Sequence, residues 1–226
     1  MIIKIDEKDI GQRRLIFEKK KVLQLVYYRW YKQIAKNLNA GGKTLEIGSG
    51  FGDFKRFFPS CVTSDIIGVR GVDLVFDANL IFPFRDHSFV NLVCIDVFHH
   101  LKDLTVFFKE ASRILKQGGR VIIIDMYISI ISYLVLRLFH FENIQQNGMV
   151  TGIFFKNRKQ NDLFANEFSI LRQEIHDFLV YPLSGGFNYP SMIPRILLNL
   201  FLSIEDKFAF LKYISAFKAT VVLEKI

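Results

Sequence analysis

Acidic residues stand at or just after the ends of five apolar runs of this chain. They are Glu46, Asp65, Asp77, Asp96 and Asp125. Such runs are typical of parallel strands that are buried on both faces, and the carboxyl ends of these strands meet at one edge of a sheet. The sequence therefore predicts that the five acids lie along a single ligand-binding edge.

A glycine-rich turn follows the first run, with Gly48, Gly50 and Gly52 at alternate positions and Ser49 between the first two. Glycine tolerates positive φ and lets a ligand approach the main chain. Glu46, just before the turn, suits an ammonium group and opposes a pyrophosphate. Dinucleotide sites usually have the spacing Gly-x-Gly-x-x-Gly, which this turn lacks. The turn therefore predicts a ligand that carries an amine, a carboxylate and a nucleoside.

The spacing of apolar residues predicts the elements that position this edge. One helix is expected over residues 10–38, and a second from Leu104 to a terminating Gly118-Gly119. Strands are expected over residues 44–47, 61–65, 72–76, 89–95, 120–124, 168–180 and 219–223. This alternation predicts an α/β fold, a Rossmann-like doubly wound, mostly parallel seven-stranded sheet with helices on both faces.

The chain divides into three regions of one domain. Residues 1–42 form a basic amphipathic segment, residues 43–127 the ligand-binding core, and residues 128–226 an acceptor-side region with the closing strands, in which residues 157–166 are expected to be a loop or lid. The longest apolar run, 121–139, is interrupted by Asp125 and Arg137, so its uncharged part is shorter than the ~20 residues of a membrane-spanning helix. We interpret it as a buried strand followed by a core helix.

Net charge, cysteine content and residue spacing bear on the compartment and on metal binding. The chain has 226 residues and a net charge of +8, and residues 1–43 hold eleven Lys and Arg against four Asp and Glu. Cys61 and Cys94 lie in apolar runs, which predicts reduced core thiols and a cytoplasmic protein. No cysteine or histidine spacing typical of a metal site is present, so no metal is expected.

Residues 43–127 resemble the core of class I S-adenosylmethionine-dependent methyltransferases of the type 11 kind. The resemblance rests on six pieces in the usual order, which cover residues 45–52, 64–65, 76–78, 82–89, 96–101 and 110–120. It implies that the chain is a methyltransferase and that its cofactor is S-adenosyl-L-methionine.

The resemblance also implies a role for each residue of the edge. Glu46 and the turn with Gly48, Ser49, Gly50 and Gly52 would hold the methionine part of the cofactor. Asp65 would bind the ribose hydroxyls, and Asp77 with the backbone of Ala78 would bind the adenine. Asp96 and Phe98 would line the methionine side near the sulfonium.

Transfer to a hydroxyl needs a base that removes the acceptor proton. The candidates are His99, His100 and Asp125, since they follow the fourth and fifth expected strands. Neighbouring histidines on a helical turn point apart, so one of the two is expected to face the site.

The acceptor side is less defined. Residues 181–187 and the segment after them look like methyltransferases found beside bacterial surface-polysaccharide genes. This likeness implies a small-molecule, glycan or lipid-linked sugar acceptor, methylation at oxygen and a role in polysaccharide biosynthesis. The basic segment over residues 1–42 and the apolar residues 191–204 would then contact the anionic inner face of a membrane.

Two alternatives stay open. The aromatic residues Tyr27, Tyr28, Trp30 and Tyr31 alternate with basic residues, a pattern that also suits RNA and would make the chain an RNA methyltransferase. No RNA-binding module accompanies them, which disfavours a nucleic acid partner. The other alternative is a protein that binds S-adenosylmethionine without catalysis.

Overall fold

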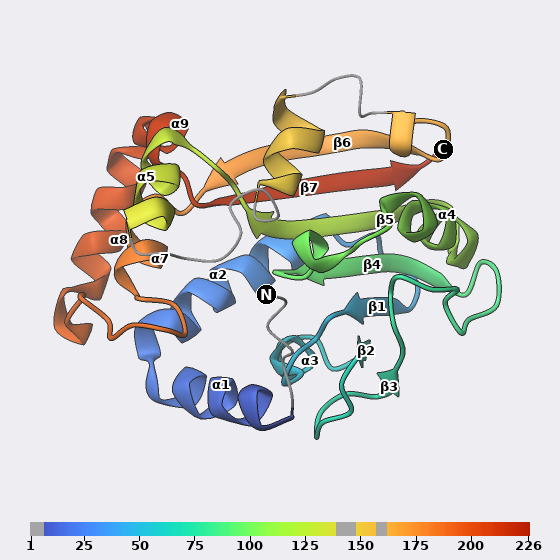
Figure 1. Cartoon of the computed structure of the whole chain (residues 1–226), viewed down its shortest axis with the longest axis horizontal. Helices are drawn as coiled ribbons and strands as arrows, with labels where there is room; N and C mark the ends of the chain where they lie inside the picture. Colours follow the sequence, from blue (N-terminus) through green and yellow to red (C-terminus); the bar gives the residue numbers. More distant parts are fainter. Residues whose placement is uncertain (1–6, 139–147, 157–161) are drawn as a thin grey trace.

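A seven-stranded sheet forms the centre of the computed structural model, which describes residues 7–138, 148–156 and 162–226. The spatial order of the strands is β3-β2-β1-β4-β5-β7-β6 (Figure 1). The strands are β1 (Thr44–Ile47), β2 (Cys61–Asp65), β3 (Leu74–Val75), β4 (Phe89–Ile95), β5 (Leu115–Met126), β6 (Phe168–His176) and β7 (Lys218–Lys225). The strands β1 to β5 run parallel, and β7 lies antiparallel between β5 and β6. The predicted mostly parallel sheet is confirmed.

Helices cover both faces of the sheet (Figure 1). The α-helices are α1 (Glu7–Lys19), α2 (Lys21–Asn37), α3 (Asp53–Phe57), α4 (Leu104–Ile114), α5 (Ile130–Leu138), α7 (Val180–Leu183), α8 (Leu198–Lys207) and α9 (Lys212–Ser215). Shorter turns of helix are η1 (Phe98–His100), η2 (Thr151–Lys156), η4 (Arg195–Leu197) and η5 (Ala209–Leu211). One apolar core contains α4, and the core on the opposite face contains α2, α3 and α7. Cys61 and Cys94 are free and buried, as predicted.

The N-terminal region forms two helices, α1 and α2, so the prediction of a single helix over residues 10–38 is wrong. The break falls at Lys20, whose backbone angles of φ −95° and ψ 88° are not helical. The ammonium of Lys20 donates to the carbonyl oxygens of Gly186, at 2.5 Å, and of Tyr189. Ile10 and Phe17 of α1 and Val22 of α2 are all buried, and no glycine or proline stands at the break, which is why the sequence pattern did not reveal it.

Two further boundaries differ from the expected ones. The helix α4 ends at Ile114 and the chain passes directly into β5, so Gly118-Gly119 lies inside a strand and not at a helix end. A side chain at Gly119 would stand 2.7 Å from the carbonyl oxygen of Lys116, so this glycine permits a close backbone approach. The third strand is also shorter than expected, at Leu74–Val75.

The prediction that the run after β5 is a core helix is also wrong. In α5 only Ser132 and Leu136 are buried, while Ile130 is 66% exposed and Leu138 is 74% exposed.

Among the described residues, no helix is long and apolar enough to cross a membrane. Residues 157–161 of the expected lid lie outside the part of the chain that the structure describes.

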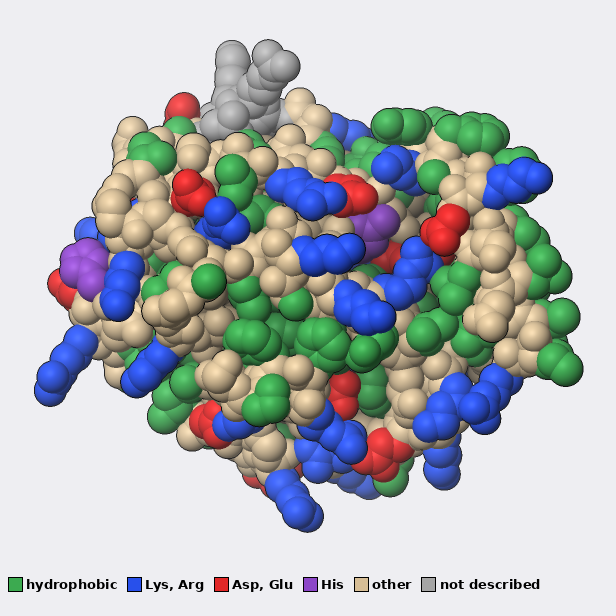
Figure 2. Space-filling view, turned by 180° about the vertical axis from the view of Figure 1, so that it is seen from behind, with side chains coloured by type: hydrophobic (Ala, Val, Ile, Leu, Met, Phe, Trp, Pro, Cys, Tyr) green, Lys and Arg blue, Asp and Glu red, His purple; other side chains and the backbone are tan. Residues whose placement is uncertain are grey.

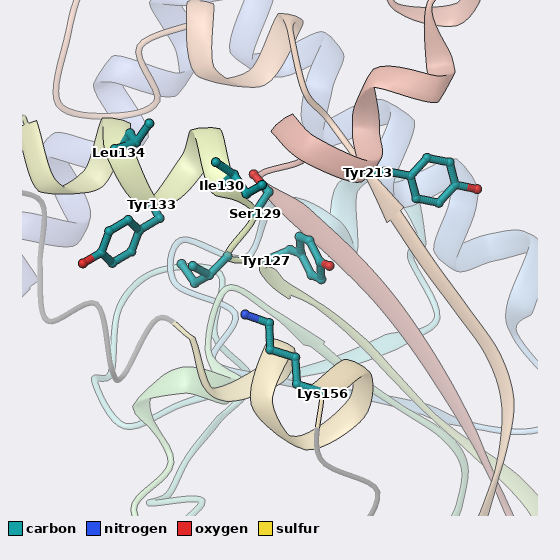
Figure 3. A pocket seen from close by; sticks show the side chains of 8 residues that line it. Tyr127, Ser129, Ile130, Tyr133, Leu134, Lys156 and Tyr213 are labelled. Carbon is teal, nitrogen blue, oxygen red and sulfur yellow. The ribbon is translucent and has the colours of Figure 1, made fainter.

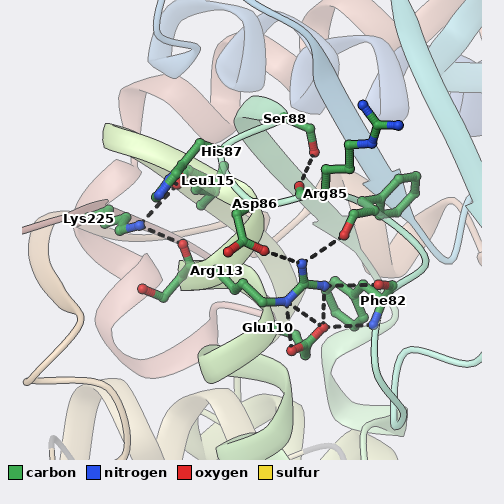
Figure 4. A network of polar contacts seen from close by, with 11 residues as sticks. Phe82, Arg85, Asp86, His87, Ser88, Glu110, Arg113, Leu115 and Lys225 are labelled. Atoms are coloured by element: carbon green, nitrogen blue, oxygen red, sulfur yellow. Dashed lines mark hydrogen bonds and ion pairs between the residues drawn. The ribbon is translucent and has the colours of Figure 1, made fainter.

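A network of polar contacts ties the loop before β4 to α4 (Figure 4). The guanidinium of Arg113 donates to the carbonyl oxygens of Phe82 at 2.9 Å and Phe84 at 2.7 Å, and it also pairs with Glu110 and Asp86. Glu110 accepts the backbone N–H of Phe82 at 2.8 Å. The Glu110 side chain is 10% exposed and that of Asp86 is 65% exposed, so we expect Glu110 to stabilise the loop far more.

Replacement of these two acids tests that difference. We expect Glu110→Gln to lower the free energy of unfolding by about 2 kcal/mol, because a buried charge-assisted contact is lost. The matched change Asp86→Asn removes an exposed pair and should leave stability nearly unchanged. Urea denaturation measures both variants, and equal losses would show that the buried carboxylate is not the one that holds the loop.

Candidate active site

Glu46 lies at the end of β1 with its side chain inside the protein. It is 4% exposed, and its Oε2 atom has no hydrogen-bond partner among the described residues. Burial, together with the negative charges of Asp53 and Asp65, raises the pKa of Glu46 to about 8. A buried polar atom without a partner is costly, so this carboxylate suits a cationic ligand group that supplies the missing contact.

The turn after β1 approaches a side chain at Gly48 and the backbone at Gly52 closely. A side chain at Gly48 would stand 2.3 Å from the Cγ2 atom of Val97, and one at Gly52 would stand 2.3 Å from the carbonyl oxygen of Gly71. At Gly50, by contrast, a side chain would meet nothing within 4 Å. The hydroxyl of Ser49 donates to the carbonyl oxygen of Ser64 at 2.7 Å. The turn is therefore held on two sides and open at Gly50, the position at which a ligand has room.

Asp65, at the end of β2, fixes the open side of this turn. Its Oδ2 atom accepts the N–H of Gly50 at 2.8 Å, and its Oδ1 atom accepts the N–H of Ile67 at 3.1 Å. Burial raises the pKa of this carboxyl, although the backbone hydrogen bonds from Gly50 and Ile67 oppose the shift. Each oxygen keeps a further lone pair, so the carboxylate retains the capacity to accept two ligand hydroxyls.

Asp77 follows β3 and organises a turn that contains Ala78. Its Oδ1 atom accepts the backbone N–H of Asn79 at 2.9 Å and the side-chain amide of Asn79 at 2.7 Å. The Oδ1 atom of Asn79 in turn accepts the N–H of Lys102 at 2.6 Å. Asn79 was not predicted as a site residue, and it connects the turn after β3 to the segment after η1.

Asp96 is joined to a residue that the sequence analysis missed. The ammonium of Lys218, at the start of β7, donates to Asp96 and lies 5.1 Å from the ring of Trp30 and 4.8 Å from the ring of Tyr181. Lys218 is 1% exposed. Burial lowers its pKa, but Asp96, Tyr181 and Asp125 together outweigh burial, so the pKa of Lys218 is raised above its ordinary value. This buried cation therefore stays charged beside the acid-lined edge.

His99 and Asp125, two of the predicted catalytic residues, contact each other. The Nδ1 atom of His99 lies 2.6 Å from Oδ1 of Asp125, and the backbone N–H of His99 donates to Oδ2 at 3.1 Å. Burial lowers the pKa of His99, but Asp125 outweighs burial and raises it overall. The same contact lowers the pKa of Asp125 against the effect of its own burial. The predicted catalytic role of both residues stays a prediction.

The neighbours of His99 occupy different surroundings. His100 is exposed, and its ring centroid lies 4.0 Å from that of His99. Phe98 is fully buried, with its ring packed against those of Phe107 and Phe108. The side chain of Phe98 thus belongs to the apolar core, which leaves its backbone to line the edge.

The N-terminal helices cover the glycine turn. Arg14 donates to the carbonyl oxygens of Phe51, at 2.7 Å, and Arg70, at 2.5 Å. The ring of Phe17 lies 5.2 Å from that of Phe51. Part of the basic character of this region therefore serves contacts within the protein.

The aromatic residues of α2 are mostly packed as well. Trp30 and Tyr31 are buried, and the ring of Tyr27 lies 4.5 Å from that of Trp30. Tyr28 is 43% exposed, with the Lys32 ammonium 4.5 Å from its ring. This arrangement leaves little free aromatic surface for stacking with bases, which weakens the RNA alternative.

A cavity of about 450 Å³ adjoins the end of β5 (Figure 3). Its lining residues come from the segment before α5, from α5 itself, from η2 and from α9: Tyr127, Ile128, Ser129, Ile130, Tyr133, Leu134, Lys156 and Tyr213. In Figure 3 the Lys156 side chain points into it from η2. The cavity therefore combines aromatic and aliphatic walls with one ammonium group.

Among the described residues, no three His, Cys, Asp or Glu side chains gather as a metal site would require.

Comparison with known proteins agrees with this fold. Residues 45–123 match a family model described as a methyltransferase domain. No curated protein sequence matches the chain.

Several solved structures resemble the chain at low sequence identity. The chain is similar to geranyl diphosphate C-methyltransferase from Streptomyces coelicolor A3(2), with 15% identity, a TM-score of 0.59 and coverage of 95% of this chain and 84% of that one. It is also similar to a protein described as a sarcosine dimethylglycine methyltransferase from Galdieria sulphuraria, with 16% identity, a TM-score of 0.54 and coverage of 95% and 98%. A third is phosphoethanolamine N-methyltransferase 2 from Haemonchus contortus, with 15% identity, a TM-score of 0.55 and coverage of 99% and 59%.

The sheet order and the family match together indicate a methyltransferase domain with a Rossmann-like fold. The match covers residues 45–123, and two of the similar proteins were solved with S-adenosylhomocysteine, the product that S-adenosylmethionine leaves after methyl transfer.

The residues at the edge fit this cofactor. The unpartnered oxygen of Glu46 matches the methionine ammonium, the open side of Gly50 leaves room for the ligand beside the main chain, and Asp65 can accept the ribose hydroxyls. These are the residues that we expect to hold the cofactor, with Asp77 and Ala78 on the adenine side.

The raised pKa of Glu46 gives a prediction about pH. Below about pH 8 the folded protein keeps this carboxyl protonated, and the group must lose its proton to pair with the cofactor ammonium. We therefore expect the affinity for S-adenosylhomocysteine to rise as the pH increases from 6 to 8. Glu46→Gln should weaken binding about tenfold and remove this pH dependence, because an amide cannot supply the charge.

The same variant should change stability in the opposite sense. An acid whose folded pKa is raised destabilises the fold as the pH increases between its unfolded and folded pKa values. Since those values are 4.5 and about 8, the stability of Glu46→Gln relative to the wild type should grow over that range. Titration calorimetry and thermal unfolding at several pH values measure both effects, and an unchanged pH profile in the variant would contradict the assignment.

Proposed function

We propose that this methyltransferase transfers a methyl group to a hydroxyl oxygen of a small amphipathic acceptor that carries a phosphate, such as a lipid-linked sugar. We further propose that it does so in the cytoplasm, as a step in the assembly of a polysaccharide. The observation that carries the proposal is the cavity beside β5, which joins three tyrosines and several aliphatic side chains to the ammonium of Lys156.

The composition of this cavity suits the proposed acceptor. Tyr127, Tyr133 and Tyr213 offer flat apolar surfaces with polar tips, a combination that accommodates an amphipathic ligand. Lys156 offers a point charge that suits a phosphate. Two structural neighbours support a phosphate-bearing ligand, since one was solved with geranyl diphosphate and another with phosphomonomethylethanolamine.

The cofactor supplies a methyl group on a sulfonium, which is already activated for displacement. The protein has to align the acceptor oxygen with that methyl group, to exclude water and to receive the hydroxyl proton. In the proposal His99 receives the proton at Nε2, because Asp125 holds the Nδ1 side of the ring. Because the pKa of His99 is raised, a larger fraction of its rings is protonated at a given pH. The basic form becomes more populated as the pH rises, so the rate of methyl transfer should increase with pH.

Acceptor trials test the proposal. The enzyme is incubated with S-adenosylmethionine and, separately, with a lipid-linked sugar phosphate, the free sugar or an RNA oligonucleotide. Release of S-adenosylhomocysteine and the mass of the product are measured. We expect methylation of the lipid-linked sugar alone, and Lys156→Met should raise its KM about tenfold through loss of a charge-assisted contact. The exposed lysine variant Lys36→Met is the matched control.

Two outcomes would favour the alternatives. Methylation of the RNA would make the chain an RNA methyltransferase, whereas cofactor binding without transfer to any acceptor would support a non-catalytic binding protein. Equal rates with the free sugar and the lipid-linked sugar would show that the phosphate is not recognised.

A further inference from the structure

An apolar end face lies at the end of the molecule formed by α5, the segment before η4, and η4, α8, η5 and α9. We define this face by its six most exposed large apolar side chains: Ile130 at 66%, Leu138 at 74%, Met192 at 64%, Ile196 at 90%, Phe210 at 64% and Tyr213 at 70%. Elsewhere in the described part of the chain, Ile81 at 80%, Leu80 at 62% and Ile66 at 61% are comparably exposed near β3. The apolar end face holds more of the strongly exposed large apolar side chains than that region does.

The elements of this face adjoin one another. The helices α5 and α9 are in contact, and α8 leads through η5 directly into α9. Figure 1 shows α5, α8 and α9 together at one side of the sheet. Figure 2, seen from behind, shows hydrophobic side chains along the corresponding edge, with Lys and Arg side chains beside them.

The charged residues of these elements are mainly cationic. Arg137, Arg195 and Lys207 are exposed, and Lys212 lies over the ring of Tyr213 at 5.8 Å. Residues 127–138 and 191–215 contain two acids, Glu205 and Asp206. Both are paired with Arg29, and Glu205 is buried and also accepts the backbone N–H groups of residues 179 and 180. The apolar end face therefore presents apolar side chains with unpaired positive charge around them.

We propose that the apolar end face docks on an anionic lipid bilayer. Protruding Ile, Leu, Phe and Tyr side chains can enter the region between headgroups and acyl chains, and the cations around them attract anionic lipids. A second copy of the chain fits less well. A two-fold interface would place the same face on both sides, so its cations would oppose each other, and the one exposed acid in the residues 127–138 and 191–215, Asp206, is already paired with Arg29.

Docking in this way orients the site. Ile130 and Tyr213 belong both to the apolar end face and to the lining of the cavity beside β5. The cavity would therefore open toward the bilayer, where an acceptor with a lipid tail resides. This orientation argument rests on the proposed function, whereas the docking itself does not depend on it.

Vesicle co-sedimentation tests the proposal, with vesicles of phosphatidylglycerol and phosphatidylcholine or of phosphatidylcholine alone. We expect the protein to sediment with the anionic vesicles at low salt and much less with the neutral ones. The double variant Ile196→Glu with Tyr213→Glu should reduce the bound fraction about tenfold, because each change puts a negative charge on the apolar side. The matched control Ile81→Glu alters an isoleucine of similar exposure in the loop after β3 and should bind as the wild type does.

Several outcomes would overturn the proposal. The wild type could fail to sediment with anionic vesicles at low salt, or Ile81→Glu could lose binding as fully as the double variant. Light scattering could also show a dimer that the double variant converts to a monomer, which would assign the apolar end face to a second copy. No cofactor or acceptor is present in this assay, so its result is independent of methyl transfer. Thermal unfolding of each variant tests whether the fold is retained.

Discussion

Replacement of Asp65 by alanine should abolish measurable binding of S-adenosylhomocysteine. The ribose hydroxyls would lose two charge-assisted hydrogen bonds, each worth about 1.5–3 kcal/mol, so the affinity should fall at least about a hundredfold. The variant also leaves the N–H of Gly50 without its acceptor at 2.8 Å, which loosens the turn that faces the methionine part. Both effects act on the cofactor and neither requires an acceptor.

Titration calorimetry and the shift of the melting temperature with ligand measure this loss. Asp65→Asn is the informative control, since an amide can still accept the Gly50 N–H through its oxygen but carries no charge. We expect Asp65→Asn to retain the melting temperature of the free protein while it loses most of the affinity. A ligand-induced shift in Asp65→Ala as large as that of the wild type would refute the position assigned to the ribose.

Replacement of Lys218 by methionine should destabilise the fold by about 3 kcal/mol, at the lower end of the cost of breaking a buried pair. The change leaves Asp96 without the cation that it pairs with, and because the Asp96 side chain is 25% exposed, water offsets part of that cost. The pKa of Lys218 is raised, so its stabilising charge is fully present below the ordinary lysine pKa and is lost only at strongly alkaline pH. The destabilisation should therefore be constant across neutral pH.

A double-mutant cycle isolates this pair from the packing of the lysine stem. We expect Lys218→Met combined with Asp96→Asn to recover part of the stability that Lys218→Met loses, because the uncompensated charge is then removed as well. Urea denaturation gives the four free energies of unfolding, those of the wild type, Lys218→Met, Asp96→Asn and the double variant. If the two changes were simply additive, the contact between Lys218 and Asp96 would contribute nothing to stability, and Lys218 would act through its contacts with Trp30 and Tyr181 alone.

The sheet and its ligand edge could be predicted from local pattern. Continuous apolar runs such as 121–124 are typical of strands buried on both faces, and parallel strands necessarily end at one edge. The placement of Glu46, Asp65 and Asp77 follows from that rule and from the glycine turn. The same local signals failed at boundaries, since neither a glycine nor a proline marks the break at Lys20.

The tertiary structure decided the contacts that join distant segments. Lys218 meets Asp96, and the two positions are 122 residues apart. His99 meets Asp125 because η1 and the end of β5 lie together, which no spacing in the sequence reveals. Which side of an apolar helix is covered is likewise decided by the elements around it, and α5 proved to be exposed where a core helix was expected.

The sequence by itself thus indicated the class of fold, a methyltransferase domain and the expected cofactor, because these depend on residue types and spacings within short segments. The acid-lined edge and the glycine turn belong to that part. Only the tertiary structure decided the cavity beside β5, the buried cation at Lys218 and the apolar end face. Each of these depends on the side chains that segments far apart in the chain bring together, and the physical consequences of burial and charge arise only there.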